Sequence, residues 1–277
     1  MAARSLLTIF IMNKTRQSRL YDFFLFCLGL VLIAGLVQAF SFLKNNQLVF
    51  PSLSEIISVF LSLLTKKHTY CLIFTTLLHL FTAVFCAFFA GILIGTLEGR
   101  FKSVYKVLFP LMTLLRSLPV IVLAVILMVL FDYAFVPFLA AVIVLVPLVS
   151  EAVYEGFCSL DKELIDVYRL NSSFSVNILF KVYIPLMSGF LRQAFNNAVG
   201  MGIKIIVTTE YLVQTKGSLG KAIFTSGYFN EYAEIYAYAL IMILLVLLLS
   251  VLPQVVLKKA SRVVFKNANR ENFSREN

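Results

Sequence analysis

The stretch from Thr69 to Leu97 contains no charged side chain, and this feature restricts the possible folds of the chain more than any other. A helix needs about 20 consecutive apolar residues to cross the hydrocarbon core of a bilayer. Similar stretches recur along the 277 residues, of which 60% are hydrophobic and only 14% are charged. A water-soluble domain of this length carries far more charge. The sequence therefore predicts a polytopic, all-α membrane protein.

The apolar stretches and the polar breaks between them predict about six transmembrane helices. The expected parts are a cytoplasmic N-terminal segment (1–20), a first transmembrane helix (21–43), an external amphipathic helix (51–64), a core of further spans (69–257) and a basic cytoplasmic tail (258–277). A cleaved signal peptide is the alternative for the first helix. No small-residue cleavage site follows that helix, so we favour an uncleaved span.

Local patterns predict how parts of this core are built. The run from Leu118 to Ser150 holds a single charge, Asp132, and is expected to form two helices joined by a turn at Asp132–Pro137. The charge-free stretch carries small residues at every fourth position: Ala83, Ala87, Gly91, Gly95 and Gly99. Small residues at this spacing let two helix backbones approach closely in lipid. We expect this face to pack against another helix of the bundle.

The basic residues predict the orientation of the six spans. With the N-terminus inside, eighteen of the 24 Lys and Arg residues fall in the inner segments and five in the outer ones, which leaves Lys204 alone within a span. Cytoplasmic loops of membrane proteins carry such an excess of basic residues. Both termini are therefore expected in the cytoplasm, together with the polar segment that begins at Asp161. The net charge of +10 is explained by this placement, and no soluble domain that could bind nucleic acid is visible.

The polar segment "DKELIDVYRLNSSFSVNILFKVYIPL" (161–186) interrupts the apolar chain. Asp161 is a good helix N-cap, and Leu164, Val167 and Leu170 recur at helical spacing. Asn171 is the expected end of this first short helix, and a second helical pattern leads to Pro185. The pattern predicts a cytoplasmic protrusion that presents apolar side chains to a partner. A solvated loop, the alternative, does not need periodic apolar residues.

This segment resembles the coupling loop of ABC-importer permeases, with the pattern E-A-A-x-x-x-G-x9-I-x-L-P. The residues at the pattern's positions are Asp166 for Glu, Val167 and Tyr168 for the two Ala, Ser172 for Gly, Val182 for Ile and Ile184-Pro185 for Leu-Pro. The spacing is preserved, and Asn171 can supply the turn of the missing glycine. The departures bear on which ATPase the loop would fit.

The resemblance extends over about residues 50–257 and points to the nitrate/sulfonate/taurine class of these permeases. It rests on "FPSLSEII", "FPLMTLLRSLPVIVLAVILMVLF", "EGFCSLDKELIDV" and "VTTEYLVQTKGSLGKAI". It implies an ABC type I importer (MetI-like) fold in a bacterial cytoplasmic membrane, with a coupling loop at 156–185. The implied partners are a separate ABC ATPase subunit, an extracytoplasmic substrate-binding protein and a second permease copy. The implied substrates are sulfonates and oxyanions, or vitamins and their precursors related to riboflavin or thiamine.

The chain shows no motif for catalysis, for a metal or for a cofactor. "KGSLGKA" (216–222) has the wrong glycine spacing for a phosphate-binding loop, and Ala222 stands where Ser or Thr must hold Mg²⁺. ATP hydrolysis is therefore expected from a separate subunit, and the chain itself is expected not to be an enzyme. The rival class is a secondary transporter or channel that works without ATP. Paired intramembrane carboxylates or repeated halves, frequent in such proteins, are not visible.

Lys204 and Glu210 are the candidates for the translocation path. A charge in a span is costly, so Lys204 is expected to face the bundle interior or a water-filled cavity. It either guides an anionic substrate or snorkels and bonds to nearby carbonyls. Glu210 belongs to an external gate or a docking surface, or is an interfacial carboxylate facing water. The two are six residues apart on one helix and lie on roughly opposite faces, so they are not expected to pair.

Overall fold

The computed structural model describes residues 51–160 and 183–249, together with Leu28, Gly29 and Gly35. Every regular element within these ranges is a helix, which confirms the predicted all-α fold class. The helices are α2 (Leu53–Thr65), α3 (Lys67–Arg100), α4 (Lys102–Ser117), α5 (Val120–Leu130), α6 (Val136–Cys158), α9 (Ile184–Leu186), α10 (Ser188–Val213), α11 (Leu219–Tyr228) and a final helix, Tyr232–Leu249. The expected first span (21–43) and the basic tail (258–277) fall almost wholly outside the described residues.

Three of the described helices are long and apolar enough to cross a membrane: α3, α6 and the final helix. Helices α4 and α5 meet the same criteria only as a pair, and the two are bent by 98° relative to each other. Helix α10 has 26 residues but is less apolar, with Arg192 and Lys204 within it. The described part of the chain thus contains three spans, or four if the bent pair is counted as one.

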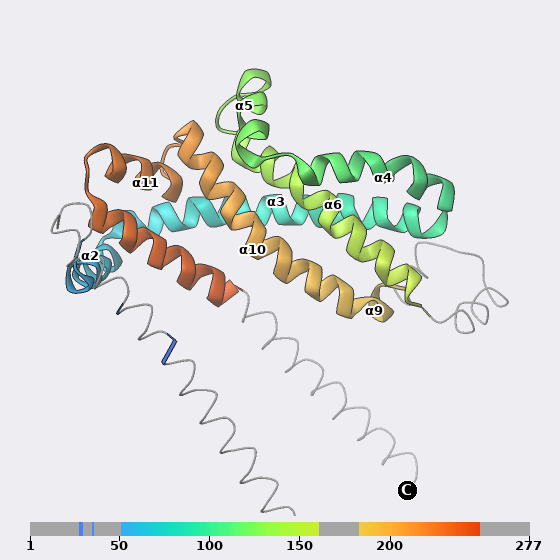
Figure 1. The fold of residues 1–277 in the computed structure, drawn as a ribbon, viewed down its shortest axis with the longest axis horizontal. Coiled ribbons are helices and arrows are strands. Elements are labelled where there is room, and N and C mark those ends of the chain that lie inside the picture. Colours follow the sequence, from blue (N-terminus) through green and yellow to red (C-terminus); the bar gives the residue numbers. More distant parts are fainter. Residues whose placement is uncertain (1–27, 30–34, 36–50, 161–182, 250–277) are drawn as a thin grey trace, which may run out of the picture.

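Helix α6 lies at the centre of the bundle, between α3 on one side and α10 on the other, with α4 beside its second half (Figure 1). The small residues of α3 lie along its contact with α6. Ala83 and Ala87 are fully buried. A methyl group added to Gly95 would lie 2.6 Å from the Ser150 carbonyl oxygen, and one added to Gly91 would lie 2.6 Å from Cβ of Val149. Side chains at these positions would therefore force the two helices apart.

The bend between α4 and α5 falls at Leu118 and Pro119. Leu118 has an extended backbone (φ −64°, ψ 127°), the conformation that a following proline favours. The predicted turn at Asp132–Pro137 is confirmed, because α5 ends at Leu130 and α6 begins at Val136. The bend was not predicted from the sequence. It divides one apolar run into two helices that point in different directions (Figure 1).

The structure corrects one expected boundary and shows helices in two stretches where the sequence analysis predicts none. The coupling loop was expected from residue 156, but α6 continues to Cys158. Helix α4 begins at Lys102, in the basic stretch after Arg100. The polar stretch 210–234 contains α11. Helix α11 forms because Ser218 caps it, with its Oγ accepting a hydrogen bond from the Lys221 amide at 3.2 Å.

Candidate functional site

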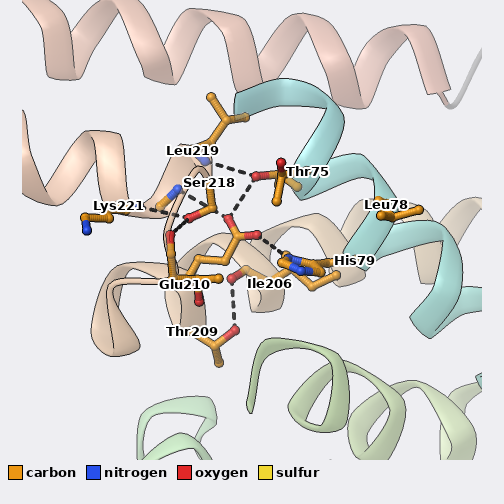
Figure 2. A network of polar contacts seen from close by, with 12 residues as sticks. Thr75, Leu78, His79, Ile206, Thr209, Glu210, Ser218, Leu219 and Lys221 are labelled. Atoms are coloured by element: carbon orange, nitrogen blue, oxygen red, sulfur yellow. Dashed lines mark hydrogen bonds and ion pairs between the residues drawn. The ribbon is translucent and has the colours of Figure 1, made fainter. Parts of the chain in front are cut away.

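The side chain of Glu210 is completely buried near the C-terminal end of α10 and is the centre of a polar network (Figure 2). The Thr76 hydroxyl donates a hydrogen bond to its Oε2 at 2.9 Å. Its Oε1 lies 2.8 Å from Nδ1 of His79, one turn further along α3. The Gly220 amide donates to Oε2 at 3.3 Å. Both carboxylate oxygens are therefore satisfied inside an apolar bundle, which offsets the cost of burying them.

The same network holds the start of α11 against α3 and α10. The Leu219 amide donates a hydrogen bond to the Thr76 hydroxyl at 3.0 Å. Leu219 and Gly220 are the first residues of α11, where a helix has free amide donors and a positive partial charge. Gly220 is also required by space, since an added Cβ would lie 2.4 Å from Cβ of Glu210 and 2.5 Å from the Tyr211 amide. Glu210 thus joins α10 and α11 to α3, whose contacting residues lie more than 130 positions earlier in the chain.

The geometry corrects one sequence hypothesis about Glu210. Glu210 was weighed as an interfacial carboxylate facing water, and that interpretation is wrong because the residue is buried. The bond between His79 and Glu210 was not predicted. The signal for it is Thr76 and His79, three residues apart on one face of the charge-free part of α3.

Lys204 lies on the opposite side of α10 from the network and is exposed. None of the described residues forms a hydrogen bond or an ion pair with it, so the expected bond to nearby carbonyls is not found in this part of the chain. Within one copy of the chain it does not face the bundle core. Lys204 and Glu210 do not form an ion pair, which agrees with the prediction from their spacing.

Most of the predicted coupling residues fall outside the described ranges. These residues are Asp161, Leu164, Asp166, Val167, Tyr168, Leu170, Asn171 and Ser172. Pro185 is described and lies in the single-turn helix α9.

The residues on either side of that segment are packed against each other. The ring of Tyr183 stacks on the ring of Phe157, at the end of α6, with centroids 5.0 Å apart. Met187 is 1% exposed and fills the space beside Gly156, where an added Cβ would lie 2.9 Å from its sulfur. The described residues on either side of 161–182 therefore form one compact junction.

A second polar group, which the sequence reading did not find, lies between α3, α4 and α6. Glu98 of α3 is only 4% exposed and accepts a hydrogen bond from the Ser150 hydroxyl of α6. Nearby, Arg116 of α4 forms an ion pair with Glu151 of α6. The two polar residues of α6 in these contacts, Ser150 and Glu151, follow a long apolar stretch, so no sequence pattern points to their partners. No cluster of three or more potential metal ligands occurs among the described residues.

A cavity of about 290 Å³ lies near the external end, between α11 and the final helix. Its polar lining includes His68, Lys221, Glu231 and Glu234. Ser226 of α11 donates a hydrogen bond to Glu234 at 2.9 Å, which connects the two helices across this cavity. The surface there is mixed in charge, in contrast to the apolar faces of the spans.

Residues 87–264 match the family of binding-protein-dependent transport system inner membrane components. The chain belongs to this family. The match covers 178 of the 277 residues and includes α4 to α11, the coupling segment and the final helix. No curated protein matches the chain by sequence.

Solved structures of the methionine ABC transporter MetNI, in inward-facing conformations, have a similar fold. The native crystal form has a TM-score of 0.61 at 18% identity, over 69% of this chain and 96% of that chain. The crystal form with a SeMet soak has a TM-score of 0.60 at 17% identity, over 68% and 93%. The expected MetI-like fold is thereby confirmed. Family and fold together make the chain a transmembrane subunit of an ABC importer.

Proposed function

We propose that this subunit forms the translocation path for a small solute, delivered by an external binding protein, and that residues 161–182 couple it to a separate ATPase. The family match carries the proposal, because its members are components of binding-protein-dependent transport systems. The more specific assignment to the nitrate/sulfonate/taurine class rests on the sequence resemblance alone. Its implied substrates are sulfonates and oxyanions, or vitamins and precursors related to riboflavin or thiamine.

The junction at the base of the coupling segment supports this mechanism. Because Tyr183 and Met187 pack on Phe157 and Gly156, a displacement of the segment is passed to the end of α6 and the start of α10 together. Packed interfaces shift between discrete arrangements and do not deform continuously. Closure of an ATPase dimer would therefore tilt both helices and change which side of the membrane the path faces.

The external end carries the features expected of a docking surface for a binding protein. Helix α2 lies against the outer end of α3, and α11 forms one wall of the mixed-charge cavity beside it. In this proposal the Glu210 network holds α11 in place, so Glu210 acts as a scaffold and does not meet the solute. Lys204, which is exposed on one copy, is available to the path between two copies.

Partner capture tests the coupling role. The tagged full chain is extracted in a mild detergent from its native membrane, and the proteins that co-purify are identified beside an Asp166→Arg variant. The matched control is Asp132→Arg, which makes the same charge change in the exposed turn before α6. We expect an ATPase with nucleotide-binding motifs to accompany the parent and the control and to be depleted with Asp166→Arg.

Two results would count against the proposal. If no ATPase accompanies the parent in several detergents, the importer mechanism fails for this chain and transport driven by an ion gradient becomes the better account. If the ATPase is retained equally by both variants, the coupling contact is not at Asp166. Uptake of solute by the chain alone, without ATP, would also favour the secondary transporter.

A further inference from the structure

A cavity of about 120 Å³ lies between α4 and the second half of α6, with Glu98 of α3 at its base. Its lining comes from one face of each helix. On α6 the lining residues are Pro147, Ser150, Glu151, Tyr154 and Glu155, and on α4 they are Tyr105, Phe109, Met112, Thr113 and Arg116. These spacings of three and four place each set on a single helix face. Two mixed faces, each with aromatic and polar side chains, therefore meet at this cavity.

Acidic side chains outnumber basic ones in the lining. It contains the three carboxyl groups of Glu98, Glu151 and Glu155 and one guanidinium, that of Arg116, which is paired with Glu151. Both partners of that pair are about half exposed, at 45% and 47%. No ion pair joins Glu98 or Glu155 to another of the described residues. This composition favours a cationic ligand over an anionic one.

Glu98 has unused capacity to bind a ligand. Its Oε2 accepts a hydrogen bond from Ser150, whereas its Oε1 accepts none from the described residues. An ionised carboxylate can accept about four hydrogen bonds. The side chain is 4% exposed and keeps capacity for further hydrogen bonds. A positively charged donor in the cavity would complete it.

The cavity also has an aromatic wall. The rings of Tyr105 and Tyr154 are stacked, with centroids 4.1 Å apart and planes only 6° from parallel, and Phe109 lies beside Tyr105 at 5.6 Å. Aromatic faces attract organic cations and pack well against flat rings. The volume is close to that of a cavity of about 150 Å³ that takes up benzene in another protein. A ligand the size of a single aromatic ring therefore fits in this cavity.

We propose that this cavity binds a small organic cation with an aromatic or alkyl body, and that such a cation is the transported solute. The second part rests on the proposed importer function. Of the two substrate groups that the resemblance implies, precursors built on nitrogen heterocycles can carry a positive charge, whereas sulfonates and oxyanions cannot. The cavity therefore favours the first group.

Binding to the purified full chain in lipid nanodiscs tests the assignment without any ATPase. The probes are benzylammonium and benzenesulfonate, which share a ring and differ in charge, with empty nanodiscs as the blank. We expect benzylammonium to bind at least about tenfold more tightly. Glu98→Gln should weaken its binding by about tenfold to a hundredfold, the usual effect of losing a hydrogen bond to a charged group.

The Arg116→Gln substitution should change the affinity for benzylammonium in the opposite direction. It removes the only cation of the lining and frees Glu151, so benzylammonium should bind several-fold more tightly even if the variant is slightly less stable. Asp132→Asn, an exposed carboxylate outside the cavity, is the matched control and should leave binding unchanged.

The cation site is overturned if benzenesulfonate binds as tightly as benzylammonium, or if Arg116→Gln weakens cation binding. Equal binding by Glu98→Gln and the parent would overturn it as well. None of these results affects the importer proposal, which is decided by co-purification of an ATPase. Cation binding by a chain that has no ATPase partner would overturn the solute assignment.

Discussion

Two buried glutamates, one near each end of the bundle, are treated differently by the fold. Glu210, near the C-terminal end of α10, has partners for both oxygens from α3 and α11 and is closed in by the backbone of Gly220. Glu98, near the C-terminal end of α3, has one partner among the described residues and lines a cavity. Burial and chemical type are nearly the same for the two side chains. What differs is whether the protein completes their hydrogen bonding.

The difference separates a structural carboxylate from a ligand-binding one. A fully bonded carboxylate fixes the helices around it and has nothing left to offer a solute. A partly bonded carboxylate beside a cavity can still form hydrogen bonds with a cation that enters it. On this basis, substitutions at Glu210 should reduce stability, and substitutions at Glu98 should mainly change binding.

The largest expected loss of stability is for Glu210→Ala. It leaves the Thr76 hydroxyl and the Gly220 amide buried without an acceptor, each costing about 1–3 kcal/mol, so the total loss is about 3 kcal/mol. The measurement is the thermal unfolding midpoint of the full chain in detergent. The comparison is Glu98→Ala, which leaves one hydroxyl unpaired. An equal loss for both variants would remove the distinction between the two glutamates.

The next largest effect is expected for Gly220→Ala. The added methyl group would meet the Glu210 side chain and two backbone groups at 2.4–2.7 Å, and backbone cannot move aside cheaply. Overpacking of this kind costs about 1–3 kcal/mol. Gly200→Ala is the control, because no atom lies within 4 Å of an added Cβ there, and alanine is the better helix former. If Gly220→Ala is as stable as Gly200→Ala, α11 is not held tightly on α10.

A smaller effect is expected for Ser150→Ala, which removes the one hydrogen bond to Glu98. The loss of unfolding free energy should be about 1 kcal/mol. Cation binding should be kept or become tighter, because Glu98 then has no bond within the protein. Denaturant titration of the variant measures the free energy of unfolding, and a separate binding titration measures the affinity for benzylammonium. A large loss of stability with no change in binding would make Glu98 a second scaffold.

The smallest effect on stability is expected for Arg116→Gln. Its ion pair with Glu151 is about half exposed, and pairs of this kind contribute about 0–1 kcal/mol after screening by solvent. The unfolding midpoint should therefore change little, while cation binding increases. A midpoint shift as large as that of Glu210→Ala would show that this pair supports the bundle.

The fold could be predicted from the sequence, but the contacts of Glu210 and Glu98 could not. Charge-free length and the polar break at Asp132 predict the helices because the bilayer imposes a length on each span. Two of the partners of Glu210, Thr76 and His79, lie more than 130 positions earlier in the chain, and no local sequence pattern predicts such a contact. Helix α11 was missed because Gly217, Gly220 and Gly227 argue for a loop, although Ser218 is a good cap.

The bend between α4 and α5 also bears on how the chain enters the bilayer. Helix α5 has 11 residues, which extend about 16 Å, roughly half of the hydrocarbon thickness. It is too short to form a span by itself. It should therefore insert together with α6, as a helical hairpin closed by the turn between Leu130 and Val136.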